Sequence, residues 1–235
     1  MKSKKVKLED VASRIRDMVI RMAYNHQSSH VGSCLSCVEI MVYLYYYKMK
    51  KGDIFILSKG HAALTQYCIL NDLGIIPAQK LWDYPKELGI HPELSKENMI
   101  FASTGSLGHG LGVGLGYAIA NRDINVYVLM GDGEMDEGSV YEALGLKGQL
   151  GATNLIPIID RNGFKGFGEI KMRTGLPDGH DFNEIDNRFS MVKEYPIIEF
   201  RTIKGKGLKR FENELGGHYW SINNDDLNEY KKDLF

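Results

Sequence analysis

Hydrophobic residues follow two different spacings along this chain, and each spacing predicts a different element. In residues 8–24 the apolar side chains recur every three or four positions, which is typical of one face of an amphipathic helix. Those positions are Leu8, Val11, Ile15, Met18, Val19 and Met22. Elsewhere the apolar residues form short continuous runs, which are typical of strands that are buried on both faces of a sheet. The predicted strands are 54–57, 126–130, 155–159 and 197–202.

The segments between these strands read mainly as helices. We predict helices over 36–48, after His61 to about Leu73, over 78–88, over 107–120, and within the tail 222–234. Strands that alternate with helices along a chain predict a parallel sheet. The expected fold class is therefore α/β, a doubly wound, mainly parallel sheet with helices on both faces. With 235 residues and no internal repeat or linker, the chain is predicted to form one domain over residues 1–235.

Composition narrows the class of protein. The chain has 29 basic and 30 acidic residues, and this balance predicts no surface for nucleic acid. No apolar run is long enough to span a bilayer, and the basic start at Met1–Lys5 is not followed by the apolar segment of a secretory signal. The 3 cysteines, an odd number, argue against a disulfide framework. We therefore predict a soluble protein of the cytoplasm, without a membrane partner.

Two of the cysteines, Cys34 and Cys37, form a CxxC pair that could indicate a metal or redox site. A structural zinc site needs four ligands, and only Cys68 and scattered histidines remain to complete one. A redox pair requires a thioredoxin-like setting, whereas this pair stands at the start of an apolar helix. We interpret both residues as reduced thiols close to the core.

The chemistry of the chain is concentrated at the ends of two predicted strands. Strand 126–130 runs into Gly131-Asp132-Gly133, and strand 155–159 runs into Asp160-Arg161-Asn162. In a doubly wound sheet both ends open onto the edge where such folds bind ligands. A carboxylate and an amide oxygen at that edge are suited to Mg²⁺. Gly133 leaves room for a phosphate near the backbone, and the helix that follows favours negative charge at its N-terminus.

The predicted helix 107–120 contains an unusual number of glycines. They occupy every second position from Gly108 to Gly116, and each costs about 1 kcal/mol relative to alanine in a helix interior. We therefore expect this helix to pack very closely against a ligand or a neighbouring element. A dinucleotide-binding motif is disfavoured because no clear strand leads into these glycines. Gly205-Lys206-Gly207 lacks the other residues of a Walker A loop.

A series of short motifs over most of the chain resembles the transketolase family, in the form that is split between two polypeptides. The motifs are Ser29-His30-Val31-Gly32, Leu57-Ser58-Lys59-Gly60-His61, Gly89-Ile90-His91-Pro92-Glu93, Thr104-Gly105-Ser106-Leu107-Gly108-His109-Gly110, Gly131-Asp132-Gly133 with Asn162, Thr202-Ile203-Lys204-Gly205-Lys206-Gly207, and His218. Gly-Asp-Gly followed by Asn after about thirty residues resembles the fingerprint of thiamine diphosphate-binding proteins. The segment between Asn162 and strand 197–202 is shorter than is usual in the family.

The resemblance implies roles for the residues of these motifs. The metal ligands would be the side chains of Asp132 and Asn162 and the backbone carbonyl of Phe164. The residues that bind thiamine diphosphate would be His61, Gly105, Leu107, Gly131, Asp132, Gly133, Glu137, Asn162 and His218. The catalytic histidines would be His30, His91, His61 and His218. Glu137 and Glu142 match acidic residues that lie at the family's dimer interface.

The resemblance also implies an activity and a partner. A transketolase uses thiamine diphosphate and Mg²⁺, for which Ca²⁺ or Mn²⁺ can substitute, to transfer a two-carbon ketol unit from a ketose or its phosphate to an aldose. This chain would be the N-terminal, diphosphate-binding subunit. The pyrimidine-binding and C-terminal domains are expected on a separate chain, in an α₂β₂ heterotetramer, so this chain alone is expected to be inactive.

Two alternatives stay open at this point. The α subunit of a 2-oxoacid dehydrogenase also carries Gly-Asp-Gly with Asn and also requires a partner, although the spread of histidines favours transketolase. A degenerate, non-catalytic subunit is the second alternative. It is favoured by the departures from the family pattern at Ser29 and Val31, beside His30, and by the shortened segment.

Overall fold

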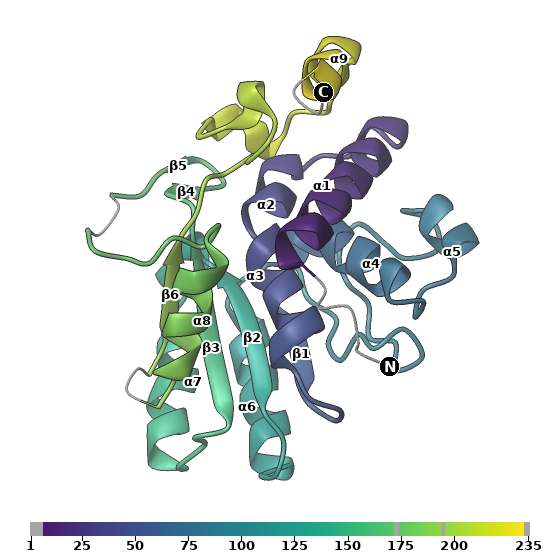
Figure 1. Cartoon of the computed structure of the whole chain (residues 1–235). Helices are drawn as coiled ribbons and strands as arrows, with labels where there is room; N and C mark the ends of the chain where they lie inside the picture. Colours follow the sequence, from purple (N-terminus) through teal and green to yellow (C-terminus); the bar gives the residue numbers. More distant parts are fainter. Residues whose placement is uncertain (1–6, 172–173, 194–195, 233–235) are drawn as a thin grey trace.

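Four parallel strands form the centre of the protein, which is described by a computed structural model covering residues 7–171, 174–193 and 196–232 (Figure 1). The strands lie in the order β1-β2-β3-β6. Their bounds are β1 Ile54–Leu57, β2 Val126–Gly131, β3 Leu155–Arg161 and β6 Ile198–Arg201. All three pairings are parallel, so the predicted doubly wound α/β fold is confirmed.

Helices cover both faces of this sheet (Figure 1). Helices α6 (His109–Ala120) and α7 (Gly138–Gln149) pack on one face, against side chains such as Ile56 and Val128. The other face carries three helices from the N-terminal part of the chain together with α8. They are α1 Leu8–Asn25, α3 Val38–Tyr43, α4 Ala63–Asp72 and α8 Phe182–Ser190. Because each strand is buried on both faces, successive side chains enter opposite cores, and this accounts for the continuous apolar runs in the sequence.

The short elements lie mostly around the carboxyl ends of the strands. They are α2 Val31–Ser36, the π-helix Leu44–Lys48, α5 Ala78–Trp82, β4 Phe164–Lys165, β5 Gly168–Glu169 and α9 Asn224–Lys232. Strands β4 and β5 form an antiparallel hairpin of their own. None of the described helices is both long enough and apolar enough to cross a bilayer.

Three helix predictions differ from the structure. The helix expected over 78–88 ends at Trp82, because Pro85 has no N–H and restricts the residue before it. The helix expected over 36–48 is divided into α3 and a π-helical turn. Helix α8 was not predicted, although Asp181 caps it by accepting hydrogen bonds from two backbone N–H groups.

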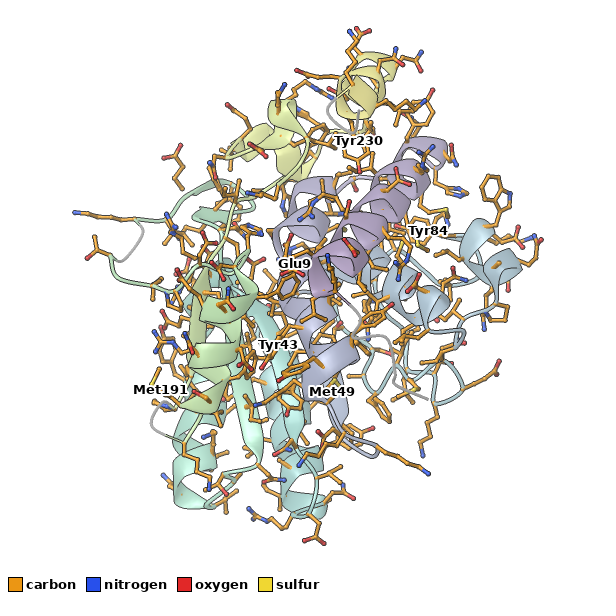
Figure 2. The ribbon with its side chains drawn as sticks, viewed as in Figure 1. Glu9, Tyr43, Met49, Tyr84, Met191 and Tyr230 are labelled. Atoms are coloured by element: carbon orange, nitrogen blue, oxygen red, sulfur yellow. The ribbon has the colours of Figure 1, made fainter. Side chains whose placement is uncertain are left out.

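The aromatic segment 43–47 contributes mainly to the core. The ring of Tyr43 stacks on Phe189 of α8 with 5.2 Å between ring centroids, and Figure 2 shows this tyrosine between α3 and α8. Tyr45 packs edge-on against Phe55 of β1. Tyr47, in contrast, is 62% exposed. Tyr43 is therefore a core residue, and Tyr45 packs against the core from a partly buried position.

The glycines of α6 have a direct packing explanation. A Cβ atom on Gly110 would lie 2.5 Å from the Cβ of Ser58, and one on Gly114 would lie 2.5 Å from a methyl carbon of Val128. The helix therefore contacts the sheet at backbone distance, as the sequence predicted. Gly112 and Gly116 point the other way, into open space.

Candidate functional site

The carboxyl ends of all four strands meet at one edge of the sheet. Gly131 at the end of β2 lies in register with Asp160 near the end of β3, so Asp132 and Asn162 leave neighbouring strands side by side. The end of β1 continues into Ser58 and Lys59, and the end of β6 continues into Thr202. Such an edge is where doubly wound folds bind ligands.

A cavity of about 310 Å³ opens at this edge. It is lined by every residue to which the motifs gave a catalytic, cofactor or metal role. These residues are His30, His61, His91, Gly105, Leu107, Gly131, Asp132, Gly133, Glu137, Asn162, Phe164 and His218. Glu142 is the exception among the acidic residues singled out, because it lies outside the cavity on the exposed side of α7.

Four histidines form one cluster on the cavity wall, with His30 in the centre. The centroid of its ring lies 4.8 Å from that of His218, 5.7 Å from that of His61 and 6.0 Å from that of His91. The backbone N–H of His30 donates to the carbonyl of His218 at 3.0 Å, so residues far apart in sequence are held together.

The protonation of this cluster is set mainly by burial. Burial lowers the pKa of His30, lowers that of His61 well below its ordinary value, and lowers that of His218 to about 4. Neighbouring imidazoles and lysine ammonium groups act in the same direction. These three histidines are therefore neutral near pH 7, and each can donate one hydrogen bond and accept another.

The carboxylate of Asp132 and the amide of Asn162 are both buried. Asp132 accepts hydrogen bonds from the N–H groups of Gly133 at 3.0 Å and Gly163 at 2.7 Å. The Oδ1 of Asn162 accepts one from the N–H of Phe164 at 3.1 Å. Burial, reinforced by the negative charge of Asp160, raises the pKa of Asp132 to about 6. Burial thus disfavours the ionised form of Asp132, and a bound cation would compensate that charge. The Asn162 oxygen has one lone pair left for the same ion, so the two side chains fit a divalent cation.

The floor of the cavity rests on a buried ion pair. The ammonium of Lys59 contacts the carboxylate of Asp160, and both side chains have 0% exposure. Burial alone would raise the pKa of Asp160, but Lys59, Ser36 and Thr202 together hold it below its ordinary value. The sequence analysis named Lys59 only as part of a motif, and no local signal connected it with Asp160.

Glu134 is a second buried acid that the sequence analysis did not select. Its carboxylate accepts hydrogen bonds from the Ser58 hydroxyl at 2.6 Å and from the N–H groups of Gly108 and Gly131, both at 2.9 Å. The Glu134 carboxylate therefore connects the end of β1, the end of β2 and the start of α6 through hydrogen bonds. The available signal was its position directly after Gly-Asp-Gly, where a carboxylate can cap the following helical turn.

The hairpin β4–β5 forms the outer wall of the cavity. The ammonium of Lys165 contacts Asp136 at 2.5 Å, across the turn that follows β2. A Cβ atom on Gly133 would lie 3.0 Å from the Cβ of Lys165, so this glycine makes room for the hairpin. Phe167 at the hairpin tip is 88% exposed, and Tyr219 across the mouth is 63% exposed. The sequence analysis selected neither aromatic residue.

The loop after β6 holds the histidine segment in place. The N–H of Gly205 donates to the carbonyl of Gly32 at 3.0 Å, and a Cβ on Gly32 would lie 3.1 Å from the side chain of Lys204. The ammonium of Lys204 lies 5.0 Å from the centre of the Phe164 ring. Burial, with the charge of Lys59, lowers the pKa of Lys204 to about 8.

The cysteine pair is not part of this site. Cys34 and Cys37 are free and buried, and burial raises the pKa of their thiols to about 11 and about 12. Among the described residues, no group of three or more His, Cys, Asp or Glu side chains is placed to hold a metal ion. The interpretation as reduced thiols near the core is confirmed.

Comparisons with known proteins agree with the motifs. Residues 8–234 match the model of the family "Transketolase, thiamine diphosphate binding domain". The transketolase of Mus musculus is 32% identical over 248 residues, which cover 90% of this chain and 39% of that protein. One of the subunits of the apulose-4-phosphate transketolase of Phocaeicola vulgatus is also 32% identical, and the match covers 90% of this chain and 88% of that polypeptide.

Solved structures show the same fold. Transketolase from Leishmania mexicana superposes with a TM-score of 0.88 at 23% identity, over 98% of this chain and 42% of that one. Transketolase from Campylobacter jejuni gives a TM-score of 0.80 at 24% identity, over 96% of this chain and 42% of that one. This chain thus spans about two fifths of the length of the full transketolases that it matches.

Proposed function

This chain belongs to the transketolase family, and we propose that it is the diphosphate-binding subunit of a split transketolase, which transfers a two-carbon ketol unit from a ketose or its phosphate to an aldose. The observation that carries this proposal is the cavity that is lined by every motif residue with an implied catalytic, cofactor or metal role. The relative from Phocaeicola vulgatus is itself named as a transketolase subunit and is matched over most of its length, which supports a division into two chains.

The proposed cofactors are thiamine diphosphate and Mg²⁺, with Ca²⁺ or Mn²⁺ as substitutes. Asp132, Asn162 and the carbonyl of Phe164 would hold the cation, and His61 and His218 would donate hydrogen bonds to the diphosphate. When bound, thiamine diphosphate supplies the electron sink for breaking and forming the carbon–carbon bond. The buried, uncompensated carboxylate of Asp132 and the neutral imidazoles beside it fit this arrangement.

The other protein groups would bind and orient the sugar. The imidazoles of His30 and His91 can form hydrogen bonds with sugar hydroxyls, and an imidazole can exchange a proton near neutral pH. Gly105 and Leu107 also line the cavity and would contact the cofactor.

The proposed assembly is an α₂β₂ heterotetramer with a pyrimidine-binding subunit. The outer face of α6 and α7 supports it, because apolar side chains stand exposed there without a covering element. They are Val113 41%, Ile119 37%, Tyr141 58%, Leu146 46% and Leu150 47%. A groove of about 410 Å³ between the two helices contains Glu142 and Gly112. Leu107, which is 36% exposed, lies just before α6, and Glu137 lies just before α7. Both residues line the cavity, so this face borders it.

The test is an activity measurement with and without a partner. The chain is purified alone and together with the protein encoded by the adjacent reading frame, and each sample is supplied with thiamine diphosphate and Mg²⁺. We expect transfer from a ketose phosphate to an aldose only by the pair. Sugar transfer by this chain alone would refute the split assembly, and decarboxylation of a 2-oxoacid in place of transfer would refute the reaction. Failure of the pair to bind thiamine diphosphate in calorimetry would favour a non-catalytic subunit.

The proposed location is the cytoplasm. Three reduced, buried cysteines support a reducing compartment.

A further inference from the structure

Asp160 is the point at which four separate segments are joined beneath the cavity. Its carboxylate accepts hydrogen bonds from Lys59 after β1, from Thr202 after β6, and from Ser36 of α2 at 2.5 Å. A fourth donor, the Nδ2 of Asn162, lies 3.4 Å away. A carboxylate can accept about four hydrogen bonds, so the acceptor capacity of Asp160 is filled.

This arrangement determines which way the Asn162 amide faces. Its Nδ2 is directed toward Asp160, while its Oδ1 accepts from the N–H of Phe164 at 3.1 Å on the cavity side. If the amide turned over, Nδ2 would meet an N–H donor and Oδ1 would meet a carboxylate. Both contacts would be repulsive, so the carboxylate of Asp160 keeps the amide oxygen toward the cavity.

Stability does not explain a charged pair at this place. Removing two charges from water costs several kcal/mol per ion, and buried pairs can often be replaced by apolar residues without loss of stability. The pair is 0% exposed on both sides, and it lies at the edge of the site rather than in either apolar core. A role in the site is the better physical explanation.

We propose that the buried Lys59–Asp160 pair is a positioning device for Asn162, and that it sets the affinity of the site for the divalent cation. Lys59 holds the Asp160 carboxylate in place, the carboxylate accepts from Nδ2, and the second lone pair of Oδ1 is left for the cation. The inference rests on the proposed cation site at Asp132 and Asn162. Groups that orient metal ligands typically contribute about 10- to 100-fold in metal affinity.

The decisive variants change both members of the pair, so that neither charge is left alone. Lys59→Met with Asp160→Asn keeps the shapes and one acceptor oxygen, and we expect Mn²⁺ affinity to fall about tenfold. Lys59→Met with Asp160→Leu removes every acceptor, and we expect a loss near 100-fold. The matched control is Arg16→Met with Glu39→Gln, a second poorly exposed ion pair (12% and 8% exposed) whose other hydrogen bonds are to Lys206 and His180. That control should bind Mn²⁺ like the unaltered chain.

The measurement is Mn²⁺ binding followed by electron paramagnetic resonance, with thiamine diphosphate present, on the full chain and on its complex with the partner subunit. The melting temperature without cation is recorded for each variant. A loss of Mn²⁺ affinity with an unchanged melting temperature supports positioning. Mn²⁺ affinity within about threefold of the unaltered chain, in a folded asparagine variant, overturns it.

Two further outcomes are also decisive. If both pair variants fail to fold, Asp160→Glu keeps a charge for Lys59 but moves the carboxylate relative to the Nδ2 of Asn162, and Mn²⁺ affinity unchanged in that variant overturns the inference. If the unaltered chain binds no Mn²⁺ in either state, the proposed function itself is refuted, and this inference falls with it. A selective loss in the variants is therefore distinguishable from failure of the site as a whole.

Discussion

Replacing Asp132 by asparagine should stabilise the cation-free protein while abolishing its cation site. Asp132 is 2% exposed, and burial with the charge of Asp160 raises its pKa from an ordinary 3.8 to about 6. Without a cation, the ionised carboxylate is therefore an unfavourable group in the folded state. Asparagine has nearly the same shape and carries no charge.

The magnitude follows from the pKa. A shift of about two units corresponds to about 3 kcal/mol, because each unit is worth about 1.4 kcal/mol. Asp132→Asn also loses an acceptor for the N–H of Gly133 or Gly163, which costs about 1 kcal/mol. The variant should therefore gain about 2 kcal/mol in free energy of unfolding near pH 7, or about 4–8 °C in melting temperature for a domain of this size.

The direction of the Asp132 pKa shift determines the pH range over which stability changes. The folded chain holds the Asp132 proton to higher pH than the unfolded chain does, so stability is lost as pH rises from about 4 to about 6. Above that window the destabilisation is constant. The stability difference between Asp132→Asn and the unaltered chain should therefore grow across the window and be largest above it.

The assay is urea unfolding in the presence of a chelator, at half-unit steps from pH 4 to pH 8. Asp136→Asn, in the same turn but exposed, is the control and should change stability by less than about 1 kcal/mol. Adding thiamine diphosphate and Mg²⁺ at about 100 times the dissociation constant should then stabilise only the unaltered chain, by about 2.7 kcal/mol. An Asp132→Asn variant that is less stable above pH 6 without cation would refute the reasoning.

Two further predictions concern the helices on the α6–α7 face. Gly110→Ala should destabilise the chain, because the new Cβ would lie 2.5 Å from the Cβ of Ser58. Gly112→Ala meets open space and should raise the free energy of unfolding by up to about 1 kcal/mol. Thermal unfolding compares the two variants, and equal effects would contradict the packing of α6 on the sheet. Leu146→Glu, at a side chain 46% exposed on α7, should leave the melting temperature of the chain unchanged but weaken assembly with the partner. Sedimentation of the mixed subunits measures this, and unchanged assembly would exclude this part of the face from the interface.

Local signals explain why most elements could be predicted. Strands β1, β2, β3 and β6 were found within two residues of their ends, because burial on both faces requires unbroken apolar runs. Helix α8 was missed because its apolar contribution is small: only Ile185 and Phe189 are buried, Phe182 is partly buried, and the other residues of the helix are polar. Pro157 has no N–H for a ladder hydrogen bond; β3 pairs with β2 there without a bulge, and its other side is an edge at this residue because β6 joins only from Ile158 onward. The missing N–H is tolerated because β6 does not pair with β3 at Pro157.

The residues of the candidate site also fall into two groups, those that the sequence indicated and those that only the structure revealed. Residues within a motif, such as His61 or Asp132, could be selected from sequence because their spacing reflects one local turn at a strand end. Glu134 was missed although it is adjacent to such a turn, because its partners Ser58 and Gly108 come from other segments. Phe167 and Tyr219 line the same cavity only because the hairpin and the late loop both reach it.

The sequence by itself determined the sheet, its helical layers and the residues suited to a cation and a diphosphate, because periodicity and short spacings are local properties of the chain. Only the tertiary structure decided that Lys59 and Asp160, 101 residues apart, form a buried pair beneath Asn162. It also decided that the four histidines share one wall and that the α6–α7 face stands exposed beside them. The physical reason is that such contacts depend on the order of strands in the sheet, which brings distant strand ends together and leaves no record in local spacing.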